Sequence, residues 1–108
     1  MSVQLSPSEL AEKLRSPSPP RLLDVREEWE HQRVALPNST LIPLGQLPFR
    51  TEEIAPWKND EVVVYCHHGV RSLMAIGILQ TLGFTRLFNL SGGIDAWSLE
   101  ADAARPRY

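Results

Sequence analysis

The residues best suited to chemistry stand in one short segment, VVVYCHHGVRS, at residues 62–72. This segment holds Cys66, the only cysteine of the chain, and Arg71 follows it closely. A thiolate is a strong nucleophile, and N–H groups, a helix N-terminus or a cation nearby lower the pKa of a thiol. A lone cysteine is more often a small buried hydrophobic residue. The tight glycine loop and the arginine directly after the cysteine favour nucleophilic chemistry here.

The elements on either side of the segment predict where the sulfur lies. EVVVY is a continuous apolar run, typical of a parallel strand buried on both faces, and RSLMAIGILQTLG predicts a helix that begins near Arg71 or Ser72. Cys66 then lies at the carboxyl edge of the sheet, where open α/β sheets bind ligands. We expect the loop N–H groups to turn inward as an anion-binding nest, with Gly69 at positive φ and Ser72 as the helix cap. The candidate cradle around the sulfur comprises His67, His68, Gly69, Val70, Arg71 and Ser72.

Strand-like and helix-like segments alternate along the rest of the chain. A capping-box pattern, SPSE, predicts a helix through residue 14. Strands are expected at residues 21–25, 40–44 and 86–90, and helices at 26–33, within 45–54 and at 92–100. Gly77 interrupts the central helix, and we expect a close packing contact there. This alternation predicts an α/β fold, a small, mostly parallel β-sheet flanked by helices on both faces.

Composition narrows the classes of partner and of compartment. The 108 residues fit one domain over residues 1–108, and the net charge of -2 argues against nucleic acid or an anionic membrane surface as the partner. No apolar stretch approaches the roughly 20 residues that cross a bilayer, and the start of the chain has no signal-peptide pattern. One cysteine excludes an internal disulfide, so we expect a reduced, cytoplasmic setting.

Several segments together resemble the rhodanese sulfurtransferases. CHHGVRS resembles the active-site loop of that family, and LLDVREEWE, at residues 22–30, resembles its early DVRE strand and turn. LIPLGQL, LGF and NLSGGIDAW fit its later segments in the right order. The resemblance implies a compact parallel sheet flanked by helices. It also implies that Cys66 accepts a sulfane sulfur, becomes a persulfide and passes the sulfur to a nucleophile.

The resemblance also implies roles for residues outside the loop. Asp24 would order the neighbouring loops and Arg26 would make a supporting ion pair, although a solvated pair stays open as an alternative. Trp29 and Trp97 are expected to be core or helix-packing aromatics. Asn38 stands where the family usually has glycine, and asparagine tolerates the left-handed region.

These observations predict a sulfurtransferase that uses a small anionic donor such as thiosulfate, or a protein persulfide, and passes sulfur to cyanide or a thiol. Only four residues separate Cys66 from Arg71, one fewer than in cysteine phosphatases, and the smaller bowl suits one added sulfur better than a phosphate. A phosphatase or arsenate reductase is therefore less favoured, and a non-catalytic binding or regulatory module stays open. No cofactor is expected. No metal is expected either, because the adjacent ligands Cys66, His67 and His68 rarely close around one ion.

Overall fold

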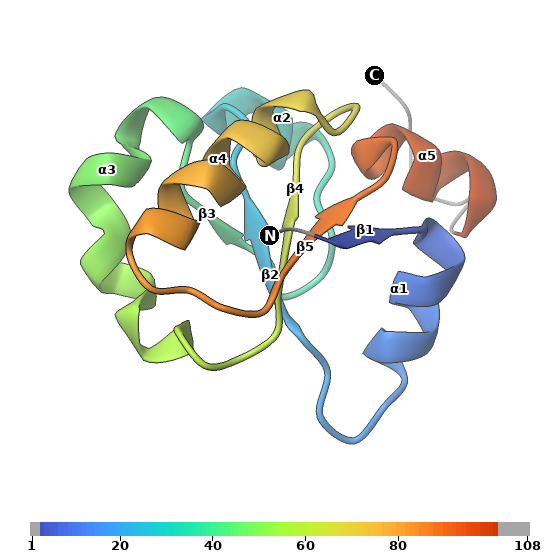
Figure 1. The fold of residues 1–108 in the computed structure, drawn as a ribbon. Helices are drawn as coiled ribbons and strands as arrows, with labels where there is room; N and C mark the ends of the chain where they lie inside the picture. Colours follow the sequence, from blue (N-terminus) through green and yellow to red (C-terminus); the bar gives the residue numbers. More distant parts are fainter. Residues whose placement is uncertain (1–2, 102–108) are drawn as a thin grey trace.

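The computed structural model describes residues 3–101, and its centre is a parallel sheet of five strands (Figure 1). The spatial order is β1-β5-β4-β2-β3, and every pairing is parallel. The strands are β1 (Val3–Leu5), β2 (Arg21–Asp24), β3 (Thr40–Leu41), β4 (Val62–Tyr65) and β5 (Leu87–Leu90). The helices are α1 (Pro7–Leu14), α2 (Glu28–Arg33), α3 (Leu47–Arg50), α4 (Val70–Thr81) and α5 (Gly93–Glu100), with 3₁₀ turns η1 (Leu44–Gln46) and η2 (Thr51–Trp57). The predicted α/β fold is confirmed.

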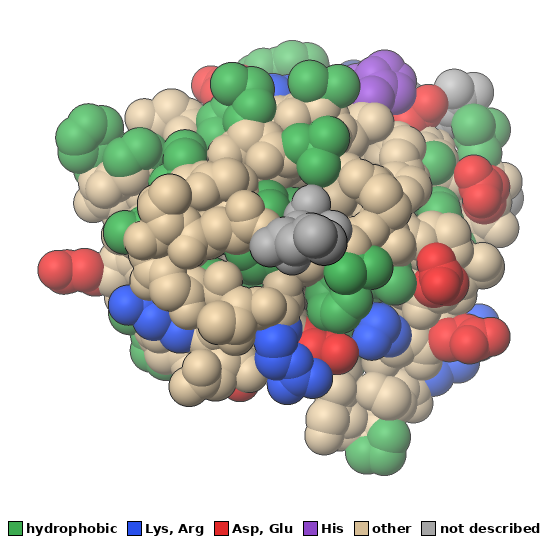
Figure 2. Space-filling model, in the orientation of Figure 1, with side chains coloured by type: hydrophobic (Ala, Val, Ile, Leu, Met, Phe, Trp, Pro, Cys, Tyr) green, Lys and Arg blue, Asp and Glu red, His purple; other side chains and the backbone are tan. Residues whose placement is uncertain are grey.

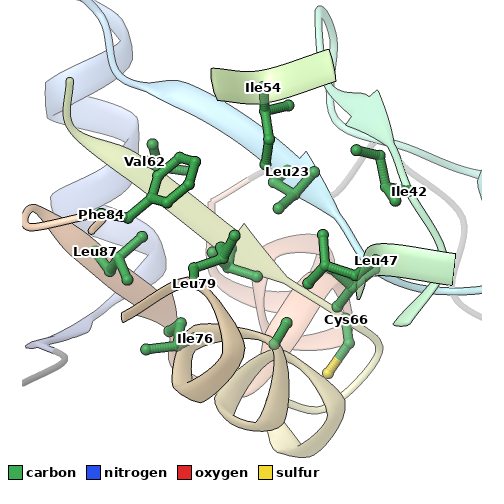
Figure 3. Packing of buried hydrophobic residues seen from close by; sticks show 13 residues of the cluster. Leu23, Ile42, Leu47, Ile54, Val62, Cys66, Ile76, Leu79, Phe84 and Leu87 are labelled. Atoms are coloured by element: carbon green, nitrogen blue, oxygen red, sulfur yellow. The ribbon is translucent and has the colours of Figure 1, made fainter. Parts of the chain in front are cut away.

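The central strand β4 divides its side chains between two hydrophobic layers. Val62, Val64 and then Cys66 face the layer beneath α3 and α4, whereas Val63 and Tyr65 face the layer beneath α1 and α5. All four residues of β4 are buried, as expected for a strand covered on both faces. Figure 3 shows Cys66 at the edge of its layer, beyond the end of β4. Strand alternation therefore fixes the face on which the sulfur lies.

Several sequence expectations are wrong in detail. The strand expected at residues 40–44 ends at Leu41, because Pro43 has no N–H and a 3₁₀ turn follows. Trp29 was expected to pack, yet 61% of its surface is exposed, whereas Trp97 is buried as expected. Asn38 does adopt a positive φ, of 62°. Among the described residues, no helix combines the length and the apolar character needed to span a membrane.

The close packing contact expected at Gly77 is absent, so that expectation is wrong. The open space around this residue gives a test of the fold. A Cβ built there meets no atom within 4 Å, and the residue is exposed in the middle of α4. Gly77→Ala should therefore raise the free energy of unfolding by about 0.5–1 kcal/mol, measured by urea unfolding. Gly83→Ala is the matched control: it has the same open surroundings but a φ of +94°, so it should destabilise. A destabilising effect of Gly77→Ala would contradict the open, helical surroundings of this residue.

Candidate active site

The Cys66 sulfur lies inside a loop whose N–H groups point toward it. Cys66 is 1% exposed, and its Sγ accepts hydrogen bonds from the Gly69 N–H at 3.0 Å and the Ser72 N–H at 3.4 Å. Gly69 takes a φ of +101°, as expected, and is the residue from which α4 begins. The helix therefore begins at Val70, one residue earlier than expected. Ser72 is not its cap: its Oγ lies 3.5 Å from Sγ and donates to the Asn89 side chain.

The carbonyl groups of the same loop point the other way, toward α5. The N–H of Ile94 donates to the Cys66 carbonyl at 2.9 Å, and the N–H of Asp95 donates to the His67 carbonyl at 3.1 Å. Gly93, at a φ of +64°, permits this approach, because a Cβ on it would lie 2.3 Å from the His67 oxygen. The first turn of α5 thus binds the loop carbonyls, and the loop N–H groups are left facing the sulfur.

These contacts change the acidity of the thiol in two opposing ways. Burial is the largest influence and raises the pKa of Cys66, since it disfavours the charged form. Once the sulfur is ionised, hydrogen bonds from the Ser72 hydroxyl and from the N–H groups of Ser72, Gly69 and His68 stabilise it and outweigh burial, so that the pKa of Cys66 lies below its ordinary value. The arrangement favours a thiolate and, equally, any anionic atom in the same place.

Arg71 is held at the loop by a residue that the sequence analysis missed. Its guanidinium donates twice to the Glu30 carboxylate, at 2.6 Å and 2.9 Å, and Glu30 is buried. Glu30 also accepts the N–H of Glu27 at 2.9 Å, which closes a capping box at the start of α2. The E-x-x-E spacing could have revealed the cap. Nothing local reveals the pairing with Arg71, which lies 41 residues away.

Asp24 and Arg26 form a buried pair, so the solvated alternative is wrong. Both side chains are fully buried, and the Arg26 guanidinium donates to Asp24 at 2.7 Å and 2.9 Å and to the Val34 carbonyl at 2.6 Å. The guanidinium also lies over the Tyr65 ring, 5.4 Å from its centroid. His31 Nδ1 is 2.8 Å from the same aspartate. His31 lies in α2 and Val34 is the residue at which this helix ends. The Asp24–Arg26 pair therefore holds in place the helix that carries Glu30.

The two histidines lie at the outer side of the loop. Their rings stack with centroids 4.0 Å apart, and His68 Nε2 is 3.5 Å from the Asp95 carboxylate. Burial lowers the pKa of His67, and His68 and Arg71 lower it further, against the opposing effects of Asp95 and Glu30. Ligand atoms of His67, His68 and Asp95 lie within 4.8 Å of one another. Stacked rings direct their nitrogen lone pairs side by side, so this trio is a poor fit to a tetrahedral zinc ion with bonds of about 2.0–2.1 Å.

Comparisons with known proteins point to one family. A model of the rhodanese-like domain matches residues 6–100. The chain is 33% identical over 95 residues to a sulfurtransferase of Allochromatium vinosum, covering 88% of this chain and 87% of that protein. It is equally identical, over 88% of its length, to a putative sulfur carrier protein, YrkF, of Bacillus subtilis, but spans only 50% of that protein. A solved rhodanese-like domain protein from Staphylococcus aureus superposes with a TM-score of 0.82 at 30% identity, covering 92% of this chain and 94% of that chain.

The lowered pKa of Cys66 predicts a pH dependence with a definite sign. Thiolate absorbance in the ultraviolet, taken as the difference from Cys66→Ala, should appear at lower pH in the folded protein than in urea. The stabilisation that accompanies ionisation is then fully present above the unfolded thiol pKa and is lost as the pH falls through the folded one. Folded and unfolded titrations that coincide, or a folded thiol that titrates later, would show that the loop does not stabilise the thiolate.

Proposed function

The chain belongs to the rhodanese-like domain family, and we propose that it is a sulfurtransferase that carries a sulfane sulfur as a persulfide on Cys66. The observation that carries this proposal is the pair of loop N–H groups, of Gly69 and Ser72, aimed at a buried sulfur. Relatives named as a sulfurtransferase and a putative sulfur carrier support the same activity.

The proposed reaction has two half-reactions that share one cysteine. The Cys66 thiolate attacks the outer sulfur of thiosulfate, the S–S bond breaks, and sulfite leaves with its electron pair. The added sulfur of the persulfide carries the negative charge and accepts hydrogen bonds from the loop N–H groups. Cyanide or a thiolate then attacks that outer sulfur, and Cys66 leaves as the thiolate. No external oxidant or reductant is needed, because the sulfur is passed on at its original oxidation level.

The other residues of the cradle have distinct proposed roles. Arg71, oriented by Glu30, supplies positive charge at the mouth of the loop for the anionic donor. The backbone of His67, His68, Gly69, Val70 and Ser72 forms the cradle itself. Asp24 and Arg26 are supporting residues that act through α2.

The exposed surface beside the loop supports a protein thiol as a physiological acceptor. Val70, Leu73 and Met74 are large exposed hydrophobic residues within the first five residues of α4, next to the cradle. Figure 2 shows hydrophobic side chains along the upper edge of the molecule, beside histidine. An apolar rim of this kind favours contact with another protein over contact with a small anion alone.

Sulfur loading tests the proposed function. After incubation with thiosulfate and removal of the excess, the intact protein should gain the mass of one sulfur atom, and a reductant should remove it. Cys66→Ala should gain nothing. Loading of Cys66→Ala to the same extent would place the sulfur elsewhere. No loading from thiosulfate or from a protein persulfide would favour the non-catalytic binding module, and turnover of a phosphate ester would favour a phosphatase.

The Glu30–Arg71 pairing gives a second prediction. Arg71→Lys keeps the charge but cannot make both bonds to Glu30, so kcat/KM for thiosulfate should fall by about tenfold or more. Arg86→Lys is the matched control. Arg86 forms an ion pair with Glu61 and lies just before β5, at the amino ends of the strands, whereas the loop follows their carboxyl ends. If the Arg71 and Arg86 variants have equal activity, the Arg71 guanidinium has no role in binding the sulfur donor.

A further inference from the structure

Asn89 makes three polar contacts, which join the active-site loop and α4 to the edge strand β1. It lies on β5, paired in register with Val64 of β4, and is 2% exposed. Its Nδ2 donates to the Gly69 carbonyl at 3.4 Å and to Gln4 Oε1 at 3.1 Å. Its Oδ1 accepts the hydroxyl of Ser72. A buried amide with these partners has no freedom to turn over.

The Gly69 carbonyl decides where the Ser72 proton lies. A carbonyl oxygen can only accept, so the NH₂ end of the Asn89 amide must face Gly69. The oxygen end then faces Ser72, and the single hydroxyl proton of Ser72 is donated to Asn89. What Ser72 presents to the Cys66 sulfur, 3.5 Å away, is therefore a lone pair.

A lone pair of Ser72 Oγ that faces the sulfur stabilises the neutral thiol and destabilises the thiolate. With a neutral Cys66, the S–H can donate to Ser72 Oγ, and every group is satisfied. An ionised sulfur is stabilised by a further donor beside the two N–H groups, and the Ser72 hydroxyl can be that donor only by withdrawing its proton from Asn89. We propose that Asn89 is a positioning residue that competes with the Cys66 sulfur for the Ser72 proton, so that the hydroxyl alternates between two acceptors as the charge on the sulfur changes.

This competition has a use if the proposed sulfur transfer is correct. When Sγ becomes the inner atom of a persulfide it loses its charge, and the Ser72 hydroxyl can return to Asn89. The bond to Asn89 thus stabilises the loaded and protonated states relative to the bare thiolate. A thiolate that is stabilised less is also the stronger nucleophile.

Charged groups on the neighbouring elements lie at the same loop, and the test must hold them constant. They are Glu30 on α2, His67 and His68 on the loop, Arg71 on α4 and Asp95 on α5. None of them is bonded to Asn89 through the contacts described above, so a comparison of variants at positions 72 and 89 isolates the hydroxyl.

The test is a double-mutant cycle read by the pH profile of Cys66 alkylation with iodoacetamide. Cys66 is the only thiol, and scaling each profile to its high-pH plateau removes differences in access. Asn89→Leu, similar in size but without polar atoms, frees the Ser72 proton, so scaled alkylation well below the midpoint should be about tenfold faster. Ser72→Ala should be slower. In the double variant, the leucine should have no further effect.

Each alternative outcome overturns the proposal. A midpoint that is unchanged or higher in Asn89→Leu means that Asn89 does not restrain the proton. An equal acceleration in the Ser72→Ala background means that the leucine merely loosens the loop. These readouts need no sulfur transfer, so a protein that fails to load sulfur but follows this cycle would refute the proposed function alone.

A measurement on the unaltered protein covers the case in which the leucine variant does not fold. The side-chain amide signal of Asn89 in ¹H–¹⁵N spectra should titrate with the same midpoint as Cys66, because Oδ1 loses its donor when the sulfur ionises. In Ser72→Ala that titration should be lost. An Asn89 signal that stays constant while Cys66 ionises would overturn the proposal.

Discussion

The site depends on the opposite orientation of the two sides of one short backbone loop. The carbonyls of Cys66 and His67 accept hydrogen bonds from the N–H groups of Ile94 and Asp95 in the first turn of α5, and the N–H groups of Gly69 and Ser72 face the sulfur. A helix N-terminus must find acceptors, and a loop between a buried strand and a helix must satisfy its own polar groups. Here the loop carbonyls satisfy the N–H groups at the start of α5, and the loop N–H groups that remain form a binding site for an anion.

The remaining polar contacts place charge around that cradle through a chain of helices and strands. The buried Asp24–Arg26 pair fixes the path from β2 into α2, α2 carries Glu30, and Glu30 orients Arg71. On the other side, Asn89 reaches the loop from β5. The loop is thus held from two helices, α2 and α5, and from β5, a strand of the sheet itself. In the proposed reaction, the same backbone would bind first the thiolate and then the persulfide.

Local patterns are enough to predict most of the fold and the position of Cys66 just beyond the end of β4. Short apolar runs predict β2, β4 and β5, a longer apolar segment predicts α4, and the tight sequence after Cys66 predicts a positive φ at Gly69. Contacts between distant segments could not be predicted. Glu30 meets Arg71 across 41 residues and Ser72 meets Asn89 across 17, and no spacing rule links either pair. The three-residue β1 escaped notice because its partner is β5, at the other end of the chain.

The central claim is that one cysteine holds the sulfur between two separate reactions, and initial-rate kinetics test it most directly. With thiosulfate and cyanide varied against each other, a persulfide intermediate predicts parallel lines in double-reciprocal plots, since sulfite leaves before cyanide reacts. The isolated, sulfur-loaded protein should also convert one equivalent of cyanide to thiocyanate without any donor present. Intersecting lines, together with a loaded protein that gives no thiocyanate, would contradict the account.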